Sequence, residues 1–580
     1  LLYAGTETGM YISFNDGKNW QKAEVVPFCR KASNYMHPAI SPDGKFVAFV
    51  KNSADRRESK TSFHLMELES RNDVEIKIEG DIKPGVIKFA PDGKSIFFRT
   101  SGKPNQYEKI YRISILGGEP ELIAEEIWGS FSVLPGGKEI AYFKRDRSGF
   151  GQNIIVRDLE TGEEKKKFEV PKQTNAFPNG APVFSPDEKI IAYIPNKFAA
   201  QRAKIGFIDA VSKSKTEIET NFQSIRDVIW NFDGKSLYIN GRVNGGQYQI
   251  WNLSYPAGDL TRVTSDSSAY RSLNTSSDGK ISVNRLNIHS NLWYIPNAEI
   301  KLAKQLTDGQ NELGGLLTAQ FMPNGEIVYN SRLKNNTRMR VINPQSGKSR
   351  LLMEQIIDNT HNFSFSVSRK LIFFEYENEI WKANFDGSNA NKVELGTASK
   401  FDQPTVSHDE KWLYFVKRSK NQASIWRKPL DEGKPELVKE TQGFSPDTFL
   451  TASPDGKYLA FVYVTPKKVS DDKSDSGNIR KYGFLNLETK EVKTLEVPAY
   501  RSILRWTDGG KSFDFPSFTK TGSAILRKSV DGESESEKVF ELEKELIYRF
   551  DWSPDGKDLM IGRGDYKMDI VILNSTDSES

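Results

Sequence analysis

Short apolar runs alternate with polar turns along the whole chain, and the same pattern returns about every 46 residues. The clearest copies are residues 41–45, 453–457 and 553–557, each Ser-Pro-Asp-Gly-Lys, and the first two precede the apolar runs 46–50 and 458–462. Pro presets φ, Asp can accept a hydrogen bond from the backbone ahead of it, and Gly tolerates a positive φ. Each copy therefore predicts a tight turn inside a β-hairpin.

Weaker copies of this turn fill the chain between the clear ones. With the aspartate position as the ruler, the units fall at Asp43, Asp92, Gly136, Asp187, Asp233, Asp278, Asn324, Ser368, Asp409, Asp455, Gly509 and Asp555. The spacing is typical of propeller blades. Single propellers usually carry about 4 to 8 blades, so twelve units predict two propellers rather than one ring.

Each unit contains enough apolar runs for four strands. The first ends in an apolar or aromatic residue just before the turn, such as Trp230, and the second follows the lysine. A third run ends in a polar turn, as at residues 250–253 before Gly258, and a fourth follows, as at 260–264. The sequence thus predicts an all-β fold, two β-propellers in series built from about twelve four-stranded blades.

The domain division follows from the same count. We expect a partial blade at residues 1–28, a first propeller at 29–305 and a second propeller at 306–580. The join is placed near 296–312, because glycines punctuate the chain there and six units lie on either side. A five-plus-seven division of the blades stays open.

The composition limits the classes of binding partner and covalent cross-link that the chain can have. Lys+Arg 81 against Asp+Glu 77 gives a net charge of +4, a mixed surface that does not favour nucleic acid. The single cysteine, Cys29, excludes an intramolecular disulfide. No run of about 18 apolar residues occurs that would span a membrane. Because the chain opens at Leu1 in a strand-like segment, we expect a processed product or a fragment.

The recurring Ser-Pro-Asp-Gly-Lys hairpin resembles the TolB-type, WD-like β-propeller repeat, and the likeness covers residues 36–574. A more particular likeness is to the extracytoplasmic propeller regions attached to bacterial receptor-type serine/threonine kinases and winged-helix regulators. It is carried by residues 249–256, 262–264, 290–293 and 569–573. Neither a kinase nor a DNA-binding motif occurs in this chain. The resemblance therefore implies a sensing or scaffold role and a periplasmic or extracytoplasmic location.

Residues 13–20 resemble the Asp box of sialidases and sortilin-type propellers, with Asn15 where that family prefers Asp. In those families the motif ties a hairpin and has no catalytic role. We expect residues 1–28 to form three strands of one blade, which either completes a ring or ends an upstream propeller.

Several segments suggest enzyme chemistry. Gly-Lys-Ser at 93–95, 234–236, 347–349 and 510–512 could end a phosphate-binding loop, which requires a glycine five positions earlier. The chain has Lys88, Ile229, Ile342 and Arg505 at those positions. We therefore expect structural turns there, and no Gly-x-Ser-x-Gly nucleophile elbow of a prolyl-oligopeptidase-type hydrolase occurs. A sialidase would need an arginine cluster, a tyrosine nucleophile and a carboxylate. The chain contains many arginines and tyrosines, but no sequence spacing identifies a catalytic set among them.

No candidate metal ligands have the sequence spacing of a known type of metal site. Five histidines lack metal-ligand spacing: His37, His64, His289, His361 and His408. His37, before Pro38, and His408, in the turn 407–410, are expected to be strand-end or turn residues. Asp471, Asp472 and Asp475 lack the spacing of a calcium loop, and the basic patches at 145–147 and 165–167 fit strand edges. We expect no metal, no cofactor and no catalytic residues.

The functional expectation has two forms. The favoured one is a non-catalytic module that binds a protein, peptide or glycan at a propeller channel mouth, as the sensing part of a bacterial envelope or signalling protein. The alternative is the substrate-gating propeller of a larger hydrolase of the prolyl-oligopeptidase kind. Binding residues are unknown at this level, although channel-facing residues are expected on the first strand of each unit, just before the turn.

Overall fold

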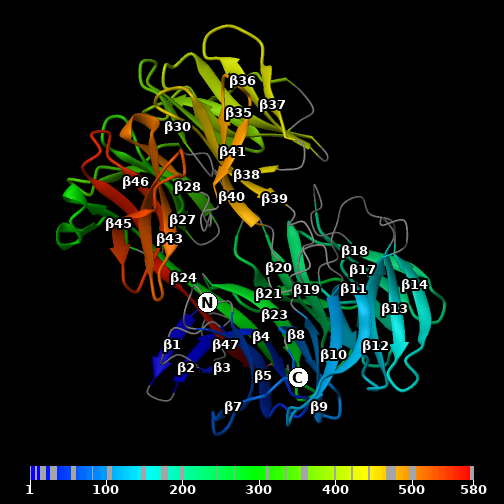
Figure 1. Cartoon of the computed structure of the whole chain (residues 1–580). Helices are drawn as coiled ribbons and strands as arrows, with labels where there is room; N and C mark the ends of the chain where they lie inside the picture. The colour runs from blue at the N-terminus through cyan, green and yellow to red at the C-terminus, as the bar shows by residue number, and fades with distance from the viewer. Residues whose placement is uncertain are drawn as a thin grey trace. The chain divides into compact units, whose positions relative to one another are not determined.

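The chain folds as strands joined by short turns in this computed structural model (Figure 1). Its helices, within the described ranges, are the 3-10 turns η1 (Pro296–Ala298), η2 (Ile300–Leu302) and η3 (Asp508–Gly510). The prediction of an all-β fold is confirmed. The structure describes residues 2–6, 9–13, 21–26, 35–53, 60–80, 82–100, 108–145, 152–170, 180–195, 202–243, 246–266, 268–308, 312–333, 336–353, 363–396, 400–419, 422–441, 445–465, 479–495 and 504–574.

The described residues divide into two compact units. Unit 1 holds the residues up to Asn287 together with those from Tyr566 onward, and unit 2 holds Ile288–Asp565. Two long strands, β24 (Lys280–Ile295) and β47 (Leu559–Asn574), each contribute one half to unit 1 and the other half to unit 2. Each unit is described below by itself.

Unit 1 consists of six antiparallel blades, numbered in chain order. Blades 1 to 3 use β4 (Tyr35–Ile40), β5 (Phe46–Asn52), β6 (Thr61–Glu67) and β7 (Asp73–Glu75); β8 (Pro84–Phe89), β9 (Ser95–Thr100), β10 (Glu108–Ser114) and the first half of β11 (Glu121–Val133); and the second half of β11, β12 (Glu139–Arg145), β13 (Gln152–Asp158) and β14 (Glu164–Val170). Blades 4 and 5 use β15 (Val183–Phe184), β16 (Ile190–Tyr193), β17 (Lys204–Asp209) and β18 (Lys215–Glu219); and β19 (Ser224–Trp230), β20 (Ser236–Arg242), β21 (Gln249–Ser254) and β22 (Leu260–Arg262). Blade 6 uses β23 (Ala269–Thr275), the first half of β24, the second half of β47 and β3 (Gln21–Val26).

Buried apolar clusters join each blade of unit 1 to the next and close the ring. One cluster joins blades 1 and 2, and four others join each following pair in turn. The sixth joins blade 6 back to blade 1, because Ile570 and Ile572 of β47 lie in one buried cluster with Val47 and Phe49 of β5. Large aromatic and β-branched side chains suit this face-to-face packing of sheets. Unit 1 is therefore a closed six-bladed propeller, called propeller 1 from here on.

Unit 2 repeats the plan with blades 7 to 12. Its strands are β26 (Glu312–Phe321), β27 (Ile327–Leu333), β28 (Asn336–Ile342) and β29 (Ser349–Leu351); β30 (Ser364–Ser366), β31 (Leu371–Tyr376), β32 (Glu379–Asn384) and β33 (Asn391–Lys392); β34 (Lys400–Val406), β35 (Trp412–Ser419), β36 (Gln422–Pro429) and β37 (Glu436–Glu440); β38 (Ser445–Ala452), β39 (Tyr458–Thr465), β40 (Ile479–Asn486) and β41 (Val492–Leu495); β42 (Arg505–Thr507), β43 (Ser512–Phe518), β44 (Ser523–Ser529) and β45 (Glu537–Leu542); and β46 (Leu546–Trp552), the first half of β47, the second half of β24 and β25 (Lys304–Gln305). Six further apolar clusters join these blades in a ring. Unit 2 is propeller 2.

The count of twelve blades, six on each side, agrees with the sequence prediction, but the boundary differs from the expected 305/306. It falls between Asn287 and Ile288, and the chain returns to propeller 1 at Tyr566. The sequence argument assumed that each blade takes four consecutive strands. Blades 6 and 12 instead combine strands from both halves of the chain, through β24 and β47.

The first strands of the chain take part in the closure. β3 pairs antiparallel with β47, for example Glu24 with Ile572, and forms the outer strand of blade 6. β2 (Gly9–Ser13) and β1 (Leu2–Thr6) extend the same sheet. Of the two alternatives for residues 1–28, the strand pairing follows the one in which they complete a ring. The Asp-box positions 14–20 lie outside the described residues.

The repeated turn explains why each hairpin forms. In blade 10, the Ser453 hydroxyl donates to Asp455 Oδ1 at 2.6 Å and accepts from the Tyr458 backbone N–H at 2.8 Å. Asp455 Oδ1 also accepts from the Lys457 backbone N–H at 3.1 Å, and Gly456 has φ 72°. The same serine–aspartate bonding recurs in blades 1, 4, 6, 9 and 12.

Ser453→Ala tests this turn. Ser453 is fully buried, so the substitution leaves the Tyr458 N–H without its acceptor and is expected to lower the free energy of unfolding by about 1–2 kcal/mol. Urea denaturation measures the change. Ser346→Ala, in an exposed turn of the same propeller, is the control and is expected to stay within about 0.5 kcal/mol. Equal effects in both variants would contradict the role of the motif serine.

Candidate functional site

The innermost strand of most blades of propeller 1 carries a β-bulge. The register shifts lie at Met36/Ala39 in β4, Pro84/Ile87 in β8, Trp128/Phe131 in β11, Ile225/Asp227 in β19 and Arg271/Asn274 in β23. A bulge adds a residue, bends the strand and redirects its side chains. Because all these strands line the axis, the bulges place their residues around the central channel.

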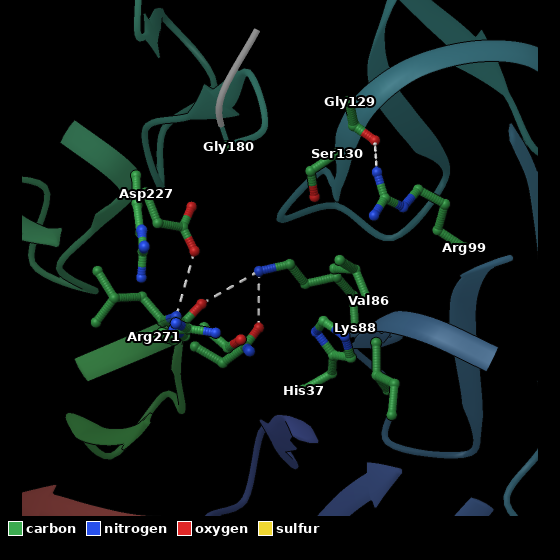
Figure 2. Close-up of a pocket in the computed structure, with 14 residues that line it drawn as sticks. His37, Val86, Lys88, Arg99, Gly129, Ser130, Gly180, Asp227 and Arg271 are labelled. Carbon is green, nitrogen blue, oxygen red and sulfur yellow. Dashed lines mark hydrogen bonds between the residues drawn. The ribbon is translucent and has the colours of Figure 1, made fainter. Parts of the chain in front are cut away.

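A cavity of about 350 Å³ lies where the bulges meet, and every blade contributes to its lining. Figure 2 shows these side chains and backbone segments converging on it from separate strands. The contributors from blades 1 to 6 include His37, Lys88, Ser130, Gly180, Asp227 and Arg271.

Hydrogen bonds between blades hold the bulges in place. The His37 backbone N–H donates to Asn284 Oδ1 at 2.9 Å, and Asn284 Nδ2 donates back to the Tyr35 carbonyl at 2.8 Å. Asn274 Nδ2 donates to the Pro38 carbonyl at 2.6 Å. His37 itself has φ 52°, a left-handed conformation that few non-glycine residues adopt. The cavity wall is thus fixed by side chains of blade 6 bound to the backbone of blade 1.

Lys88 and Asp227 are the most deeply buried titratable side chains that line the cavity. Lys88 Nζ donates to Asn274 Oδ1 at 2.7 Å and to the Leu273 carbonyl at 3.3 Å (Figure 2). The Asp227 carboxylate accepts from the backbone N–H groups of Val228 at 3.1 Å and Leu273 at 3.2 Å. Burial lowers the pKa of Lys88 and raises the pKa of Asp227, while each charge offsets part of the other's shift.

Arg99 and His37 add to the positive side of the cavity in different ways. Arg99 Nη1 donates to Glu108 Oε2 at 2.6 Å and to the Gly129 carbonyl, so its charge is largely balanced. Burial, followed by the charges of Arg99 and Arg271, lowers the pKa of His37 to about 4. His37 is therefore neutral near pH 7 and contributes a polar ring rather than a charge.

Arg226 and Arg271 are the cations that the fold leaves unbalanced. The Arg226 guanidinium carbon lies 3.7 Å from the centroid of the Tyr248 ring, and the Tyr248 hydroxyl donates to Ser224 Oγ at 3.0 Å. Within the described part of the chain, neither arginine is ion-paired with a carboxylate. The cavity therefore carries a net positive charge that an anionic group could balance.

A second cavity of about 430 Å³ lies on the turn side of the same channel and is mostly apolar. The repeat turns supply Pro42, Pro91, Pro135 and Pro186, and the strand ends supply aromatic residues such as Trp230. Of these lining residues, Phe89, Phe184 and Trp230 stand just before the turn, where the sequence predicted channel-facing residues. Lys88 borders both cavities.

The other sequence candidates lie elsewhere. The Gly-Lys-Ser segments are hairpin turns, with positive φ at Gly93, Gly234, Gly347 and Gly510, so the structural interpretation is confirmed. His64 lies in β6 beside Asp73, His289 beside Asp565, and His408 in the turn after β34. Lys165 in β14 pairs with Asp158. His361 and residues 471–475 lie outside the described residues.

The sequence interpretation missed the residues of the cationic cavity. His37 was expected at a strand end or turn, and it lines the axial cavity instead. Arg226, Asp227 and Arg271 were not singled out. A signal was present: charged residues interrupt the apolar alternation of an innermost strand between Ile225 and Val228.

The described residues contain no group of three or more His, Cys, Asp or Glu side chains arranged to hold a metal ion. They also contain no helix with the length and apolarity needed to cross a lipid bilayer.

The fold and this cavity define a protein with two six-bladed β-propellers and a basic axial cavity in the first. No family model matches the sequence. Dipeptidyl-peptidase 5 of Porphyromonas gingivalis is 23% identical over 177 residues, 28% of this chain and 25% of the relative. The chain thus matches about a quarter of that curated protein's length.

Solved structures similar to the chain are also distant. TolB from Acinetobacter baumannii has 12% identity and a TM-score of 0.32, with 65% of this chain and 81% of TolB covered. The β-propeller domain of the Trilobed protease from Pyrococcus furiosus has 13% identity and a TM-score of 0.32, with 56% of this chain and 99% of that domain covered. TolB is among these structures, as the resemblance of the repeat predicted. The likenesses to kinase-linked propellers and to the Asp box stay predictions.

Proposed function

We propose that this chain is a non-catalytic binding module, which takes a protein, peptide or glycan at the channel mouth of propeller 1. The observation that carries the proposal is the cationic cavity formed by the bulged inner strands of that propeller. Rigid blades position the lining side chains, and Arg226 and Arg271 stay free for a ligand. On the resemblance of the repeat sequence, we place the module in the extracytoplasmic, sensing part of a bacterial envelope or signalling protein.

The chemistry of the cavity supports binding rather than catalysis. Its hydroxyl groups are Ser130 and Ser272, and within the described residues neither is hydrogen-bonded to His37, the histidine of the cavity. A serine nucleophile needs such a base within hydrogen-bond reach. With its pKa lowered to about 4, His37 is also too weak a base to activate a hydroxyl efficiently.

A second candidate is the substrate-gating propeller of a larger hydrolase. The local similarity to a curated peptidase, dipeptidyl-peptidase 5, favours it. In that case the catalytic residues would lie in another domain, and the channel would select what reaches them. The full coding sequence distinguishes the candidates, because a hydrolase domain and a kinase with a membrane helix have different motifs.

Ser130→Trp tests the favoured function by filling the cavity with an indole ring. We expect the wild-type protein to bind members of a defined peptide and glycan array, and this binding to fall about ten-fold or more in Ser130→Trp. Thr216→Trp, on the exposed outer strand of blade 4, is the matched control and should bind normally. Undiminished binding in Ser130→Trp, or turnover of peptide or glycoside substrates by the wild-type chain, would overturn the proposal.

A further inference from the structure

Arg226 and Arg271 both line the cavity and supply its unbalanced positive charge. The two residues come from the bulges of adjacent blades, and the ring of Tyr248 lies under the Arg226 guanidinium. The charge of Arg271 works together with burial to lower the pKa of Arg226. Two neighbouring cations without a carboxylate partner repel one another, and an oxyanion between them removes that repulsion. Guanidinium groups match carboxylate and phosphate oxygens in paired hydrogen bonds.

The same cavity also contains the Asp227 carboxylate, a hydrogen-bond acceptor that an anion without N–H donors could not satisfy. Asp227 adjoins Arg226 in sequence, and its carboxylate faces the cavity opposite Lys88 (Figure 2). Sulfate would bring only negative oxygens close to this carboxylate, and phosphate near neutral pH would offer it no N–H donor and at most its O–H groups. A ligand that joins a carboxylate to N–H donors would meet the arginines with one end and Asp227 with the other.

The size of the cavity favours the end of a chain. At about 350 Å³ it lies near the lower limit of small-ligand sites, roughly 300–1,000 Å³. It sits on the axis and is surrounded by all six inner strands. A folded protein surface cannot enter such a space, whereas the last residues of an extended peptide can.

We propose that the cavity binds the C-terminal carboxylate of a peptide or protein, with Arg226 and Arg271 on the carboxylate and Asp227 accepting from peptide N–H groups. This inference rests on the proposed binding function and specifies the ligand of the same site. The free terminus of a short peptide and that of a protein share this chemistry, and the bound residues are the same in both.

Calorimetric titration of the full chain with three probes tests the inference. The probes are N-acetyl-trialanine with a free carboxylate, the same peptide as a C-terminal amide, and inorganic phosphate. We expect the free acid to bind about ten-fold or more tightly than the amide, because the amide lacks the charge that the arginines recognise. We expect phosphate to bind more weakly than the acid. Equal affinity for acid and amide, or tighter binding of phosphate, would overturn the inference.

Variants assign the effect to the two arginines. Arg271 is exposed, so Arg271→Gln is expected to keep the fold. The variant is expected to lose several-fold of the preference for the free acid over the amide. Arg226→Gln combined with Arg271→Gln should abolish the preference. Arg112→Gln removes an arginine that is paired with Glu121 on an outer strand of blade 2, and it should leave the preference unchanged. A preference that survives in the double variant would place the carboxylate elsewhere.

The outcomes separate this inference from the proposed function. If Ser130→Trp abolishes array binding while acid and amide bind equally, the channel mouth is the binding site and the ligand is not a carboxylate terminus. If Ser130→Trp leaves array binding intact, both the proposed function and this inference fail.

Discussion

Ile570→Asp is expected to unfold propeller 1, whereas Ile561→Asp on the same strand is expected to unfold propeller 2. Both isoleucines of β47 are fully buried, Ile570 in the cluster that joins blades 6 and 1 and Ile561 in the cluster that joins blades 11 and 12. A carboxylate at either position would lose its hydration without gaining a partner. The expected cost to the affected propeller is about 4 kcal/mol or more.

Hydrogen exchange measured by mass spectrometry distinguishes the two variants. Ile570→Asp should remove amide protection from β4, β5 and β23, and Ile561→Asp from β44 and β46. Lys567→Asp, at an exposed position of the same strand, should change stability by no more than about 0.5 kcal/mol. Loss of protection in the same strands for both isoleucine variants would contradict the division of β47 between two propellers.

Glu375 is expected to make propeller 2 less stable as the pH rises. Burial, followed by the charge of Asp402, raises the pKa of Glu375 from about 4.5 to about 8, although Arg418 and Lys400 oppose the shift. Between these two pH values the folded protein keeps a proton that the unfolded chain has released. Its contribution to stability is therefore fully present below about pH 4.5 and is lost as the pH rises to about 8.

Glu375→Gln tests this pH dependence because the amide cannot titrate. The variant should match the wild-type protein at pH 5 and exceed its stability at pH 8.5 by a few kcal/mol, since each pKa unit corresponds to about 1.36 kcal/mol. Hydrogen exchange of β31 and β34 at the two pH values gives the measurement. Parallel pH profiles for the two proteins would show that Glu375 is already ionised at pH 5.

The number of blades could be predicted because each turn depends on a few adjacent residues. Pro, Asp and Gly fix the local backbone, and Ser453 completes the bonding within the same turn. The domain boundary depends on the pairing of β24 with β47, two strands far apart in the sequence, and no local sequence pattern predicts that pairing. A four-strand rule applied along the chain therefore placed the boundary too late.

The candidate site could not be predicted for a different reason. A bulge carries no fixed residue type: it contains His37 in one blade, Gly129 in another and Ser272 in a third. Two of these residues, His37 and Ser272, hold positive φ angles without being glycine. Only the packing of six blades around one axis brings such unlike residues into one cavity.

The return of β47 to propeller 1 sets an order of events during synthesis on the ribosome. Blade 6 cannot be completed until Asn574 has been translated, although blades 1 to 5 end near Arg262. At roughly 5–20 residues per second, the nascent first ring stays open for tens of seconds, with unpaired strand edges that can associate with other chains. The second ring has all its strands by Asp565 and can finish earlier, so of the two propellers the one whose synthesis starts first is completed last.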